Sequence, residues 1–440
     1  MKLAPYPEYK DSGQPFLGDI PAHWNLFRNG RLFSQRNETG FGELPILEVS
    51  LKTGVRVRDM ENLKRKQVMA DREKYKRAAQ GDIAYNMMRM WQGAVGVAPV
   101  DGLVSPAYVV VRPFPEVDCR YYSYLFRTAS YMNEVDAYSR GIVKDRNRLY
   151  WQDFKRMPSP VPSIEEQRHI TRFLDAVGSK AQRFIRNKLR LIELLKEQKQ
   201  NVINQAVTGG LDPKIKFKPS GVEWIGDIPE HWEVRRLKFL ARIRNGQDYK
   251  EVEAESGYPV MGSGGQFAYS SAFMYEGESV LFGRKGTIDK PLYINGRFWT
   301  VDTMFYTEVS KLVSAKFLYF SALSFPFDYY STKTALPSMT QQDLGNHPVA
   351  LPPRDEQELI IQYIEEESQL IDQAISRAQR EIELMREYRT RLISDVVTGQ
   401  VDVRGIEVPE VVEEVLLSLD DDAAEADDVI DDEGDMDETD

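Results

Sequence analysis

The 440-residue sequence contains a single cysteine, Cys119. A lone thiol excludes an intramolecular disulfide framework and a cysteine-rich metal site. No segment approaches the ~20 uninterrupted apolar residues that a membrane span needs. The first ten residues also lack the apolar core of a signal peptide. We therefore expect a protein of the reducing cytoplasm that does not associate with a membrane.

The sequence also lacks the motifs of the common catalytic centres. It has no Gly-x-Gly-x-x-Gly fingerprint, no phosphate loop and no acidic or Asn-Pro-Pro-aromatic run of the kind adenine methyltransferases use. The glycine-rich stretch most similar to a phosphate loop, residues 262–265, has no following lysine, and we interpret it as a turn. His23 and His231 stand beside tryptophans and are typical of a structural corner. We predict no catalytic residue and no metal ligand in this chain.

Charge is unevenly distributed along the chain. The net charge is −11, but residues 407–440 hold 17 acidic residues and no Lys or Arg, so the remainder carries +6. Residues 1–162 alone hold 25 Lys/Arg against 18 Asp/Glu. The body of the protein is therefore basic, and its first part carries most of the excess.

The sequence contains an internal repeat. Residues 10–13 and 17–24 (LGDIPAHW) recur 208 positions later, where residues 225–232 read IGDIPEHW. Residues 162–167 (PSIEEQ) and 207–209 (VTG) recur 190 positions later as 352–357 (PPRDEQ) and 397–399. The framing segments agree and the middles differ, which favours one scaffold with two specificities.

Each copy ends in a long amphipathic pattern. Apolar residues recur every three or four positions between Ile170 and Ala206 and between Ile360 and Val396. The first pattern begins at a capping box, Ser163 with Glu166, and is expected to end at Gly209. Each helix would run for about 40 residues, or roughly 60 Å.

Helices of this length need a partner. Residues 163–207 hold nine basic and five acidic residues, whereas 355–396 hold five and eleven, so the two helices carry opposite charge. Connectivity favours antiparallel packing, which would separate the two globular domains. A homo-oligomeric coiled coil would explain the same apolar stripes.

The predicted fold class is α+β. Two mixed α/β domains are separated by a pair of long antiparallel, coiled-coil-like helices with an internal pseudo-two-fold repeat. Residues 104–111 and 279–282 are expected to be strands. The predicted segments are residues 1–162 (first domain), 163–209 (first helix), 210–352 (linker and second domain), 353–404 (second helix) and 405–440 (acidic tail).

Basic, amide and aromatic side chains in the first domain suit nucleic acid, because Lys and Arg contact phosphates and Arg, Asn and Gln pair with base edges. Seven basic residues fall within positions 64–77, although a solvated face would also explain them. The candidates in this domain are Lys64, Arg65, Lys66, Lys74, Lys76, Arg77, Asn86, Arg89, Trp91, Gln92, Arg140, Lys144, Arg146, Asn147 and Arg148.

The second domain has different side chains at the positions that correspond to these candidates. Aligning Asp153 with Asp343 puts residues 336–338 (LPS) where residues 146–148 (RNR) stand in the first copy. The candidates here are Ser263, Gln266, Tyr269, Arg284, Lys285, Thr287, Lys333, Thr334, Ser338 and Thr340.

Taken together, these motifs resemble a known family. The Gly-Asp-Ile-Pro-x-His-Trp segments, the Glu-Gln helix entries, the Val-Thr-Gly exits and residues 283–286 (GRKG) with 302–303 (DT) resemble the specificity subunit of type I restriction-modification enzymes. The resemblance covers residues 1–404. It implies two target recognition domains, each reading one half of an asymmetric, bipartite site in duplex DNA.

The resemblance also implies partners. Two modification subunits would supply S-adenosylmethionine binding and adenine-N6 methylation, and restriction subunits would use ATP and Mg to translocate and cleave, as part of host defence. None of these cofactors is expected in this chain. A self-contained methyltransferase-endonuclease and an autonomous DNA-binding or scaffold protein are the alternatives.

The acidic segment 405–440 lies outside the resemblance. Such a composition is typical of a disordered, solubilising tail. A second hypothesis is that the tail competes with DNA for a basic groove.

Overall fold

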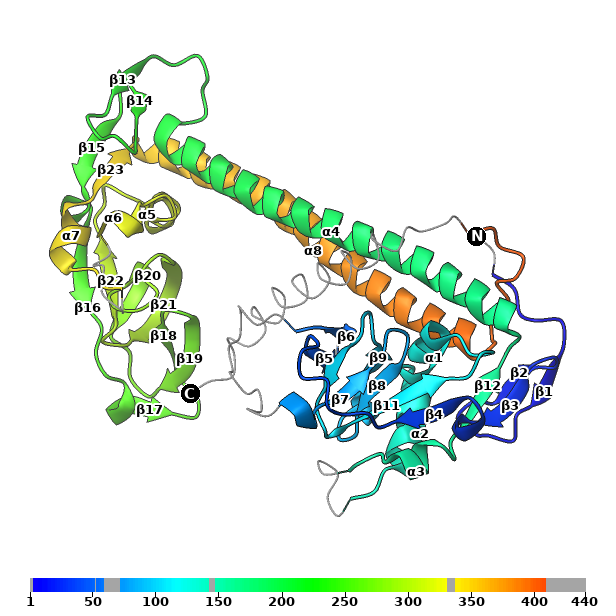
Figure 1. Cartoon of the computed structure of the whole chain (residues 1–440). Helices are drawn as coiled ribbons and strands as arrows, with labels where there is room; N and C mark the ends of the chain where they lie inside the picture. Colours follow the sequence, from blue (N-terminus) through cyan, green and yellow to red (C-terminus); the bar gives the residue numbers. More distant parts are fainter. Residues whose placement is uncertain (1–2, 52, 59–71, 142–146, 331–336, 409–440) are drawn as a thin grey trace. The chain divides into compact units, whose positions relative to one another are not determined.

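The computed structural model describes residues 3–408 except 52, 59–71, 142–146 and 331–336 (Figure 1). Two compact units result: described residues up to 188 and from 380 onward form the first unit, and residues 189–379 form the second. The predicted α+β class is confirmed, because each unit combines helices with antiparallel strand pairs. No helix within the described ranges is both long and apolar enough to cross a membrane.

Two long helices dominate the chain: α4 (Ile164–Gly209) and α8 (Arg354–Val397). The predicted cap is present at the start of α4, where the Ser163 hydroxyl accepts a hydrogen bond from the Glu166 backbone N–H at 3.2 Å. The helix α4 ends at Gly209 as expected, but Gly209 is not itself the left-handed residue. Gly209 is still helical, and the left-handed residue that follows is Gly210, with φ of 72°. Only glycine adopts this conformation without a steric cost from Cβ.

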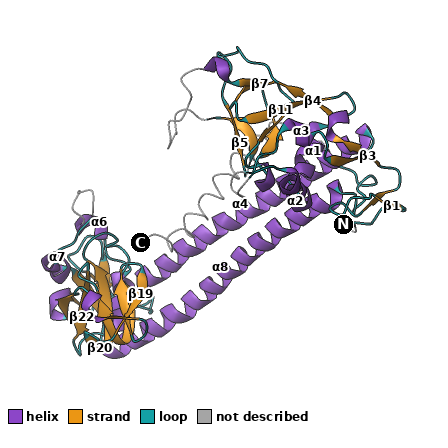
Figure 2. Cartoon of the chain, turned by 90° about the horizontal axis from the view of Figure 1, so that it is seen from below, coloured by secondary structure: helices purple, strands orange, loops and turns teal. Residues whose placement is uncertain are grey.

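The two helices run side by side (Figure 2), and their contacts in each unit show that they are antiparallel. In the first unit Ile170 shares a core with Val396, and Lys188 forms an ion pair with Glu381. In the second unit the Lys199 ammonium lies 2.8 Å from Asp372, and residues 203–207 share a core with residues 360–364. Residues later in α4 thus contact residues earlier in α8. These contacts confirm the predicted antiparallel pairing, and the two ion pairs confirm its charge complementarity.

The first unit is built around an antiparallel four-stranded sheet of order β4-β11-β8-β9. Its strands are β4 (Phe33–Arg36), β11 (Tyr108–Pro113), β8 (Ile83–Asn86) and β9 (Val95–Val97). Further pairs join β5 (Leu47–Ser50) to β6 (Gly54–Val57) and β7 (Lys76–Ala78) to β10 (Gly102–Val104). The helices are α1 (Cys119–Phe126), α2 (Ala129–Tyr138) and α3 (Trp151–Phe154). The strand expected at 104–111 is therefore split between β10 and β11 by a turn at Ser105.

The second unit contains a seven-stranded sheet of order β16-β22-β20-β21-β18-β19-β17. The strands are β16 (Ala241–Asn245), β17 (Glu253–Ala254), β18 (Tyr258–Gly262), β19 (Gly265–Ser270), β20 (Tyr275–Gly283), β21 (Leu292–Thr300) and β22 (Met304–Val309). The expected strand at 279–282 lies within β20. Gly277 and Gly296 are register partners with φ of 138° and 117°, so glycine permits a conformation in both strands that other residues rarely adopt. Three short helices complete the unit: α5 (Ala315–Ala322), α6 (Phe327–Tyr330) and α7 (Gln341–Asn346).

The framing segments of the repeat adopt the same structure twice. In the first unit β1 (Tyr9–Asp11) pairs with β2 (Asp19–Pro21), and β3 (Asn25–Arg28) pairs with β12 (Pro158–Val161). In the second unit β13 (Phe217–Pro219) pairs with β14 (Asp227–Pro229), and β15 (Glu233–Arg236) pairs with β23 (Pro348–Leu351). The register Tyr9 to Pro21 recurs as Phe217 to Pro229, at the sequence offset of 208.

A buried glutamine ties each long helix to its domain. Gln167 donates to the Pro162 carbonyl at 2.9 Å and accepts from the Asp118 N–H at 2.9 Å. Gln357 makes the same contacts with the Pro352 carbonyl, at 3.0 Å, and the Ser314 N–H, at 2.8 Å. The Glu-Gln entry of the repeat is thus a structural joint, because its amide satisfies backbone groups that burial would otherwise leave unpaired.

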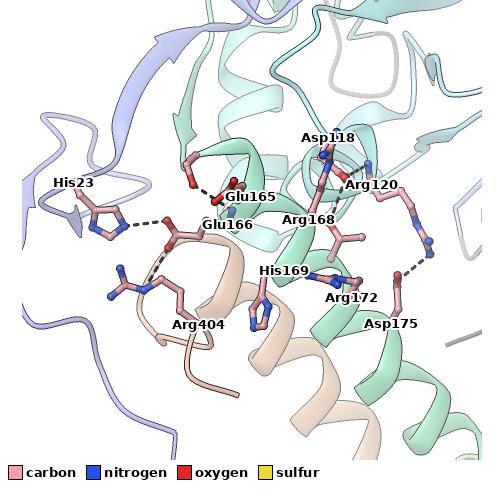
Figure 3. Close-up of a pocket in the computed structure, with 12 residues that line it drawn as sticks. His23, Asp118, Arg120, Glu165, Glu166, Arg168, His169, Arg172, Asp175 and Arg404 are labelled. Carbon is pink, nitrogen blue, oxygen red and sulfur yellow. Dashed lines mark hydrogen bonds and ion pairs between the residues drawn. The ribbon is translucent and has the colours of Figure 1, made fainter. Parts of the chain in front are cut away.

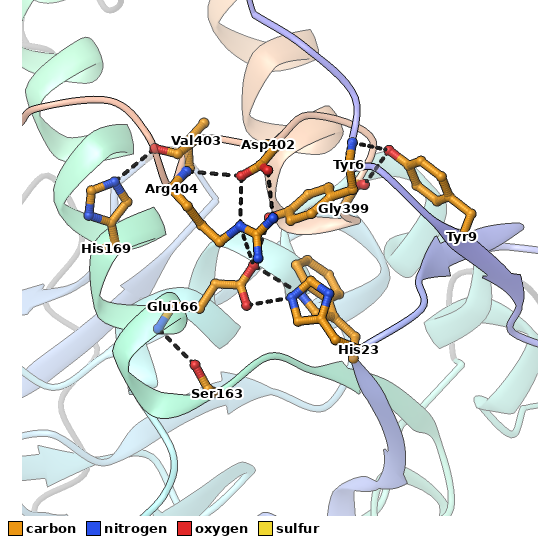
Figure 4. A network of polar contacts seen from close by, with 11 residues as sticks. Tyr6, Tyr9, His23, Ser163, Glu166, His169, Gly399, Asp402, Val403 and Arg404 are labelled. Atoms are coloured by element: carbon orange, nitrogen blue, oxygen red, sulfur yellow. Dashed lines mark hydrogen bonds and ion pairs between the residues drawn. The ribbon is translucent and has the colours of Figure 1, made fainter.

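Glu166 joins the two ends of the described chain in the first unit (Figure 4). Its carboxylate accepts from His23 at 2.9 Å, from the Tyr6 hydroxyl at 2.8 Å and from the Trp24 indole at 3.1 Å. The Arg404 guanidinium lies 4.0 Å away. In the second unit His231 reaches Glu356 at 2.8 Å. Both histidines therefore take part in structural corners, as their sequence context predicts.

The buried ring of His347 makes the second unit sensitive to acid. The side chain is 2% exposed and its ring centroid lies 3.7 Å from that of Phe325. Desolvation lowers the pKa of His347 from 6.5 to about 4. Between these two pH values the unfolded chain therefore binds a proton at His347 that the folded chain does not bind. The free energy of unfolding decreases as the pH falls through this window.

We expect this histidine to remove about 2–3 kcal/mol of stability from the second unit between pH 7.5 and pH 4.5. Urea unfolding of wild type and His347→Phe at both values measures it. The variant should lose less stability on acidification by that amount. Parallel pH dependence in the two proteins would contradict the assignment.

Candidate nucleic-acid interface

The predicted loops of the first unit meet at the ends of β8 and β11. Asn86 ends β8 and is the register partner of Tyr108. The Leu149 N–H donates to the Met87 carbonyl at 2.9 Å, which brings the segment before α3 against this loop. Arg140 and Arg148 form an isolated antiparallel bridge through two backbone hydrogen bonds of 3.0 Å. Two clusters that are about 50 residues apart in sequence therefore form one surface.

Three polar side chains of this surface are open to solvent. Arg89, Gln92 and Arg148 are exposed, and the described part of the chain offers their side chains no hydrogen-bond or ion-pair partner. A guanidinium and an amide held at the rim of a rigid strand end are available for phosphate oxygens and base edges.

Other predicted residues beside them are occupied by intramolecular contacts. Asn86 is buried, and its side-chain amide oxygen accepts a hydrogen bond from the Met88 N–H at 2.9 Å. Asn147 donates to Asp136 at 3.1 Å, and Arg140 forms an ion pair with Asp153. Trp91 donates its indole N–H to the Met88 carbonyl at 3.0 Å. These contacts favour roles in shaping the loops.

The basic cluster at 64–77 divides in the same way. Lys64, Arg65 and Lys66 lie outside the described residues, as do Lys144 and Arg146 of the neighbouring loop. Lys74 is exposed on the turn before β7.

The last two members of this cluster have intramolecular partners. The Lys76 ammonium donates to the Tyr108 carbonyl at 2.8 Å, and burial lowers its pKa. Arg77 pairs with Asp101 at 2.8 Å and with Glu38 at 3.2 Å. Lys76 thus links the cluster to the strand end that carries the loops.

The second unit brings its own predicted loops together around residues 301–303. The Arg284 N–H donates to the Thr303 carbonyl at 2.7 Å, and the Met339 N–H donates to the Arg284 carbonyl at 3.0 Å. Lys285 and Ser338 form an antiparallel bridge. The β18–β19 hairpin joins from the other side, because the Val301 N–H donates to the Met261 carbonyl at 3.2 Å.

Among the predicted residues that the structure describes in the second unit, Gln266, Tyr269, Lys285 and Thr287 have exposed side chains. Tyr269 is 43% exposed, whereas Ser263 and Ser338 are half-buried. The half-buried Arg284 donates to the Asp302 carbonyl at 3.3 Å. Lys333 and Thr334 lie outside the described residues.

Thr340 has a structural role at the start of a helix. Its hydroxyl caps α7 by accepting from the Asp343 N–H at 3.1 Å. This contact occupies the side chain as an N-cap.

The two surfaces are built on equivalent backbone positions. Leu149 and Met339, which are 190 positions apart, donate to Met87 and Arg284 respectively. The loop that holds Met87 in the first unit therefore holds Arg284 in the second. Sequence comparison missed this equivalence, because the 208 and 190 offsets flank a region of unequal length. The common strand pair, β8–β11 and β20–β22, is the signal that identifies it.

A pocket of about 960 Å³ lies elsewhere in the first unit, at the start of α4 (Figure 3). Arginines from α1, α4 and the segment after α8 line it together with acidic residues, and none of the predicted DNA-contact residues does. Within the described residues, no three His, Cys, Asp or Glu side chains are arranged to hold a metal ion.

Comparison with known proteins agrees with this architecture. Residues 229–384 match the family described as the type I restriction modification DNA specificity domain. The type I restriction enzyme MjaVIII specificity subunit of Methanocaldococcus jannaschii is 25% identical over 284 residues, which are 58% of this chain and 64% of that relative. The chain thus matches just under two thirds of that relative's length.

Two solved structures share the fold. One comes from work on complex assembly and conformational transition of the type I R-M system; it has a TM-score of 0.68 at 16% identity and covers 86% of this chain and 98% of its own. The HsdS subunit from Thermoanaerobacter tengcongensis has a TM-score of 0.54 at 16% identity and covers 87% and 98%.

Proposed function

Because this chain belongs to the specificity subunits of type I restriction-modification systems, we propose that its two units read the two halves of one asymmetric, bipartite DNA site. The chain is the recognition component and not the catalytic one. Each unit would contact one half-site, and the bases between the halves would not be read.

Loops that are distant in sequence converge on equivalent strand ends in both units, and this convergence is the main support for the proposal. Backbone hydrogen bonds from Leu149 to Met87 and from Met339 to Arg284 fix the two loop pairs in the same arrangement. The exposed side chains on that arrangement differ, with Arg89, Gln92 and Arg148 in one unit and Gln266, Lys285 and Thr287 in the other. A shared scaffold with different polar side chains suits two different base sequences.

The chemistry of recognition follows from these groups. Arg89 and Arg148 present guanidinium groups that pair bidentately with guanine or with phosphate, and Gln92 presents an amide that pairs with adenine. Lys285 presents a point charge that suits a phosphate oxygen. Cations supply affinity that falls with salt, whereas the amides and guanidinium groups on base edges supply sequence preference.

The chemical steps belong to partners in this proposal. Two modification subunits would bind S-adenosylmethionine and methylate adenine at N6 after the base leaves the stack. Restriction subunits would use ATP and Mg to translocate and cleave the DNA. This chain would determine where those subunits act.

Substitutions at Gln92 and Lys285 test the proposal in the assembled methyltransferase. Gln92→Ala is expected to relax preference at one base of one half-site by about 5- to 150-fold, because a bidentate base contact contributes ~1–3 kcal/mol. Lys285→Ala is expected to weaken binding to all sequences and to reduce the salt slope by about one. Binding of a library of randomised sites, at several salt concentrations, measures both. Wild-type preference and salt slope in both variants would overturn these assignments.

A further inference from the structure

The β18–β19 hairpin of the second unit exposes an aromatic ring that the predicted DNA contacts do not include (Figure 1). Phe267 is 56% exposed and stands between Gln266 and Tyr269 in sequence, two residues of the candidate surface. The hairpin is continuous with that surface, because the Val301 N–H donates to the Met261 carbonyl at 3.2 Å. Single exposed apolar residues are common on protein surfaces. What distinguishes Phe267 is how the hairpin holds it.

Phe267 lies in a β-bulge. Val260 pairs with Ala268 and Met261 pairs with Gln266, so the register shifts and Phe267 has no partner on β18. Successive residues of a regular strand face opposite sides of the sheet, yet Gln266 and Phe267 are both exposed. A bulge re-aims the side chain of its extra residue in this way. The backbone thus presents the ring outside the normal alternation of the strand.

The Phe267 ring is supported on two sides. A Cβ atom at Gly262 would lie 3.2 Å from the ring, so glycine at this position leaves room for it against the turn. The Tyr249 ring meets it edge-on, with the ring centroids 5.3 Å apart. The segment that carries Tyr249 is fixed to β21, because the Trp299 indole donates to the Gln247 carbonyl at 2.9 Å. A ring that is positioned in advance loses less conformational entropy when it binds a ligand.

The tip of the hairpin is open to a partner. β17 pairs with β19 only at Tyr269 and Ser270. Among the strands that the structure describes, none pairs with the outer edge of β19 at residues 265–268. Glu253, the acidic residue of β17, pairs with Ser270 and so lies at the end of β19 away from the turn. A polyanion can therefore approach the tip without meeting this carboxylate.

We propose that Phe267 inserts its ring at one base step of the half-site that the second unit reads, and partly unstacks the two base pairs. The inference rests on the proposed recognition function and adds a contact residue to it. Apolar side chains act as wedges in this way in DNA-bending proteins, where the ring replaces part of the lost stacking. Pyrimidine–purine steps unstack most easily, so the ring would favour such a step without a hydrogen bond to either base.

The test uses the full chain assembled with the modification subunits proposed above. Duplexes carry 2-aminopurine in place of one purine at a time across the recognised site, because the fluorescence of this base rises when it leaves the stack. Apart from the methylated adenine, neighbouring positions in one half of the site should brighten when the wild-type complex binds. Phe267→Ala should abolish this rise, whereas Phe267→Leu should retain part of it, because leucine is also an apolar wedge.

Affinity provides a second readout. Phe267→Ala is expected to weaken binding to the recognised site by about 5- to 100-fold, the range found when an aromatic ring is removed from a base. The salt dependence of binding should stay as in wild type, because no charged group is lost. Lys285→Ala, in contrast, is expected to reduce it.

The matched control is Phe239→Ala. Phe239 is 60% exposed on the 3-10 helix η5 (Leu237–Phe239), which precedes β16 at the other edge of the sheet. This variant removes the same side chain from the same unit, at a site with no place in the proposed interface. Its affinity and fluorescence profile should equal those of wild type.

Two results would overturn the proposal. The first is a fluorescence profile that is the same in Phe267→Ala as in wild type, including one in which only the methylated adenine brightens. The second is weaker assembly of Phe267→Ala with the modification subunits and normal DNA binding once assembled, which would assign the ring to a protein interface. Neither result affects the recognition function, which fails instead if the wild-type complex shows no preference among randomised sites.

Discussion

Replacing Gln357 with leucine is expected to destabilise the second unit by about 3–5 kcal/mol. The side chain is fully buried and holds the Leu312 and Pro352 carbonyls and the Ser314 N–H at 2.8–3.0 Å. Leucine fills a similar volume but leaves three backbone groups without this partner, two of them on the buried residues Pro352 and Ser314. Hydrogen exchange of the segment around Ser314 measures the change within the unit, because a two-unit chain need not unfold in one step.

Gln362→Leu is the matched control. It makes the same substitution on the same helix, at an exposed position whose side chain reaches only Glu366, at 2.8 Å. Its expected effect is within about 0.5 kcal/mol. If the two variants exchange alike, the glutamine joint does not hold the helix to its domain. Gln167→Leu should reproduce the loss in the first unit.

Removing both open arginines of the first unit, by Arg89→Ala/Arg148→Ala, is expected to lower the affinity for the specific site on the order of 100-fold or more. Each charged contact to a base edge or phosphate contributes ~1–3 kcal/mol, and 1.4 kcal/mol is tenfold in affinity. The loss should be larger at low salt, where phosphate contacts contribute most. Equilibrium binding to a site-containing duplex, with the chain assembled with the modification subunits proposed above, measures it.

Arg28→Ala/Arg112→Ala controls for charge. Both arginines are exposed on the first unit, on β3 and at the end of β11 away from Tyr108. Their removal lowers the net charge equally without touching the convergent loops. A decrease of the same size in both double variants would mean that overall charge, and not the loop surface, determines binding.

The two long helices and the framing segments could be predicted from the sequence, because local signals or the internal repeat specify them. Period and capping specify α4 and α8, and opposite charge together with a short linker specifies their antiparallel pairing. The end of α4 at Gly209 follows from the sequence, but the sequence does not say which of two adjacent glycines adopts the left-handed conformation. The hydrogen bonds of Gln167 and Gln357 could not be predicted, because the Glu-Gln motif alone does not show which backbone groups lie beside the side chain.

The candidate DNA-contact surfaces could be predicted only in part. Composition identified the loops, but not which of their side chains are free. Arg77 and Asn86 have the right chemistry for nucleic acid, yet Asp101 and the Met88 N–H occupy them. Asp101 lies in the bend before β10, and the Met88 N–H reaches Asn86 through a turn, so no local pattern reveals these partners. The pocket beside Arg168 likewise depends on α1 and the segment after α8 meeting at one place.

An exchange of residues 25–157 is the decisive experiment on whether each unit reads one half of the DNA site. Residues 25–157 are replaced with the corresponding segment of a known specificity subunit, the chain is co-expressed with the modification subunits proposed above, and methylated adenines are mapped across the genome. One half of the recognised site is expected to change while the other half and the spacing stay as they were. A change in both halves, or in neither, would contradict it.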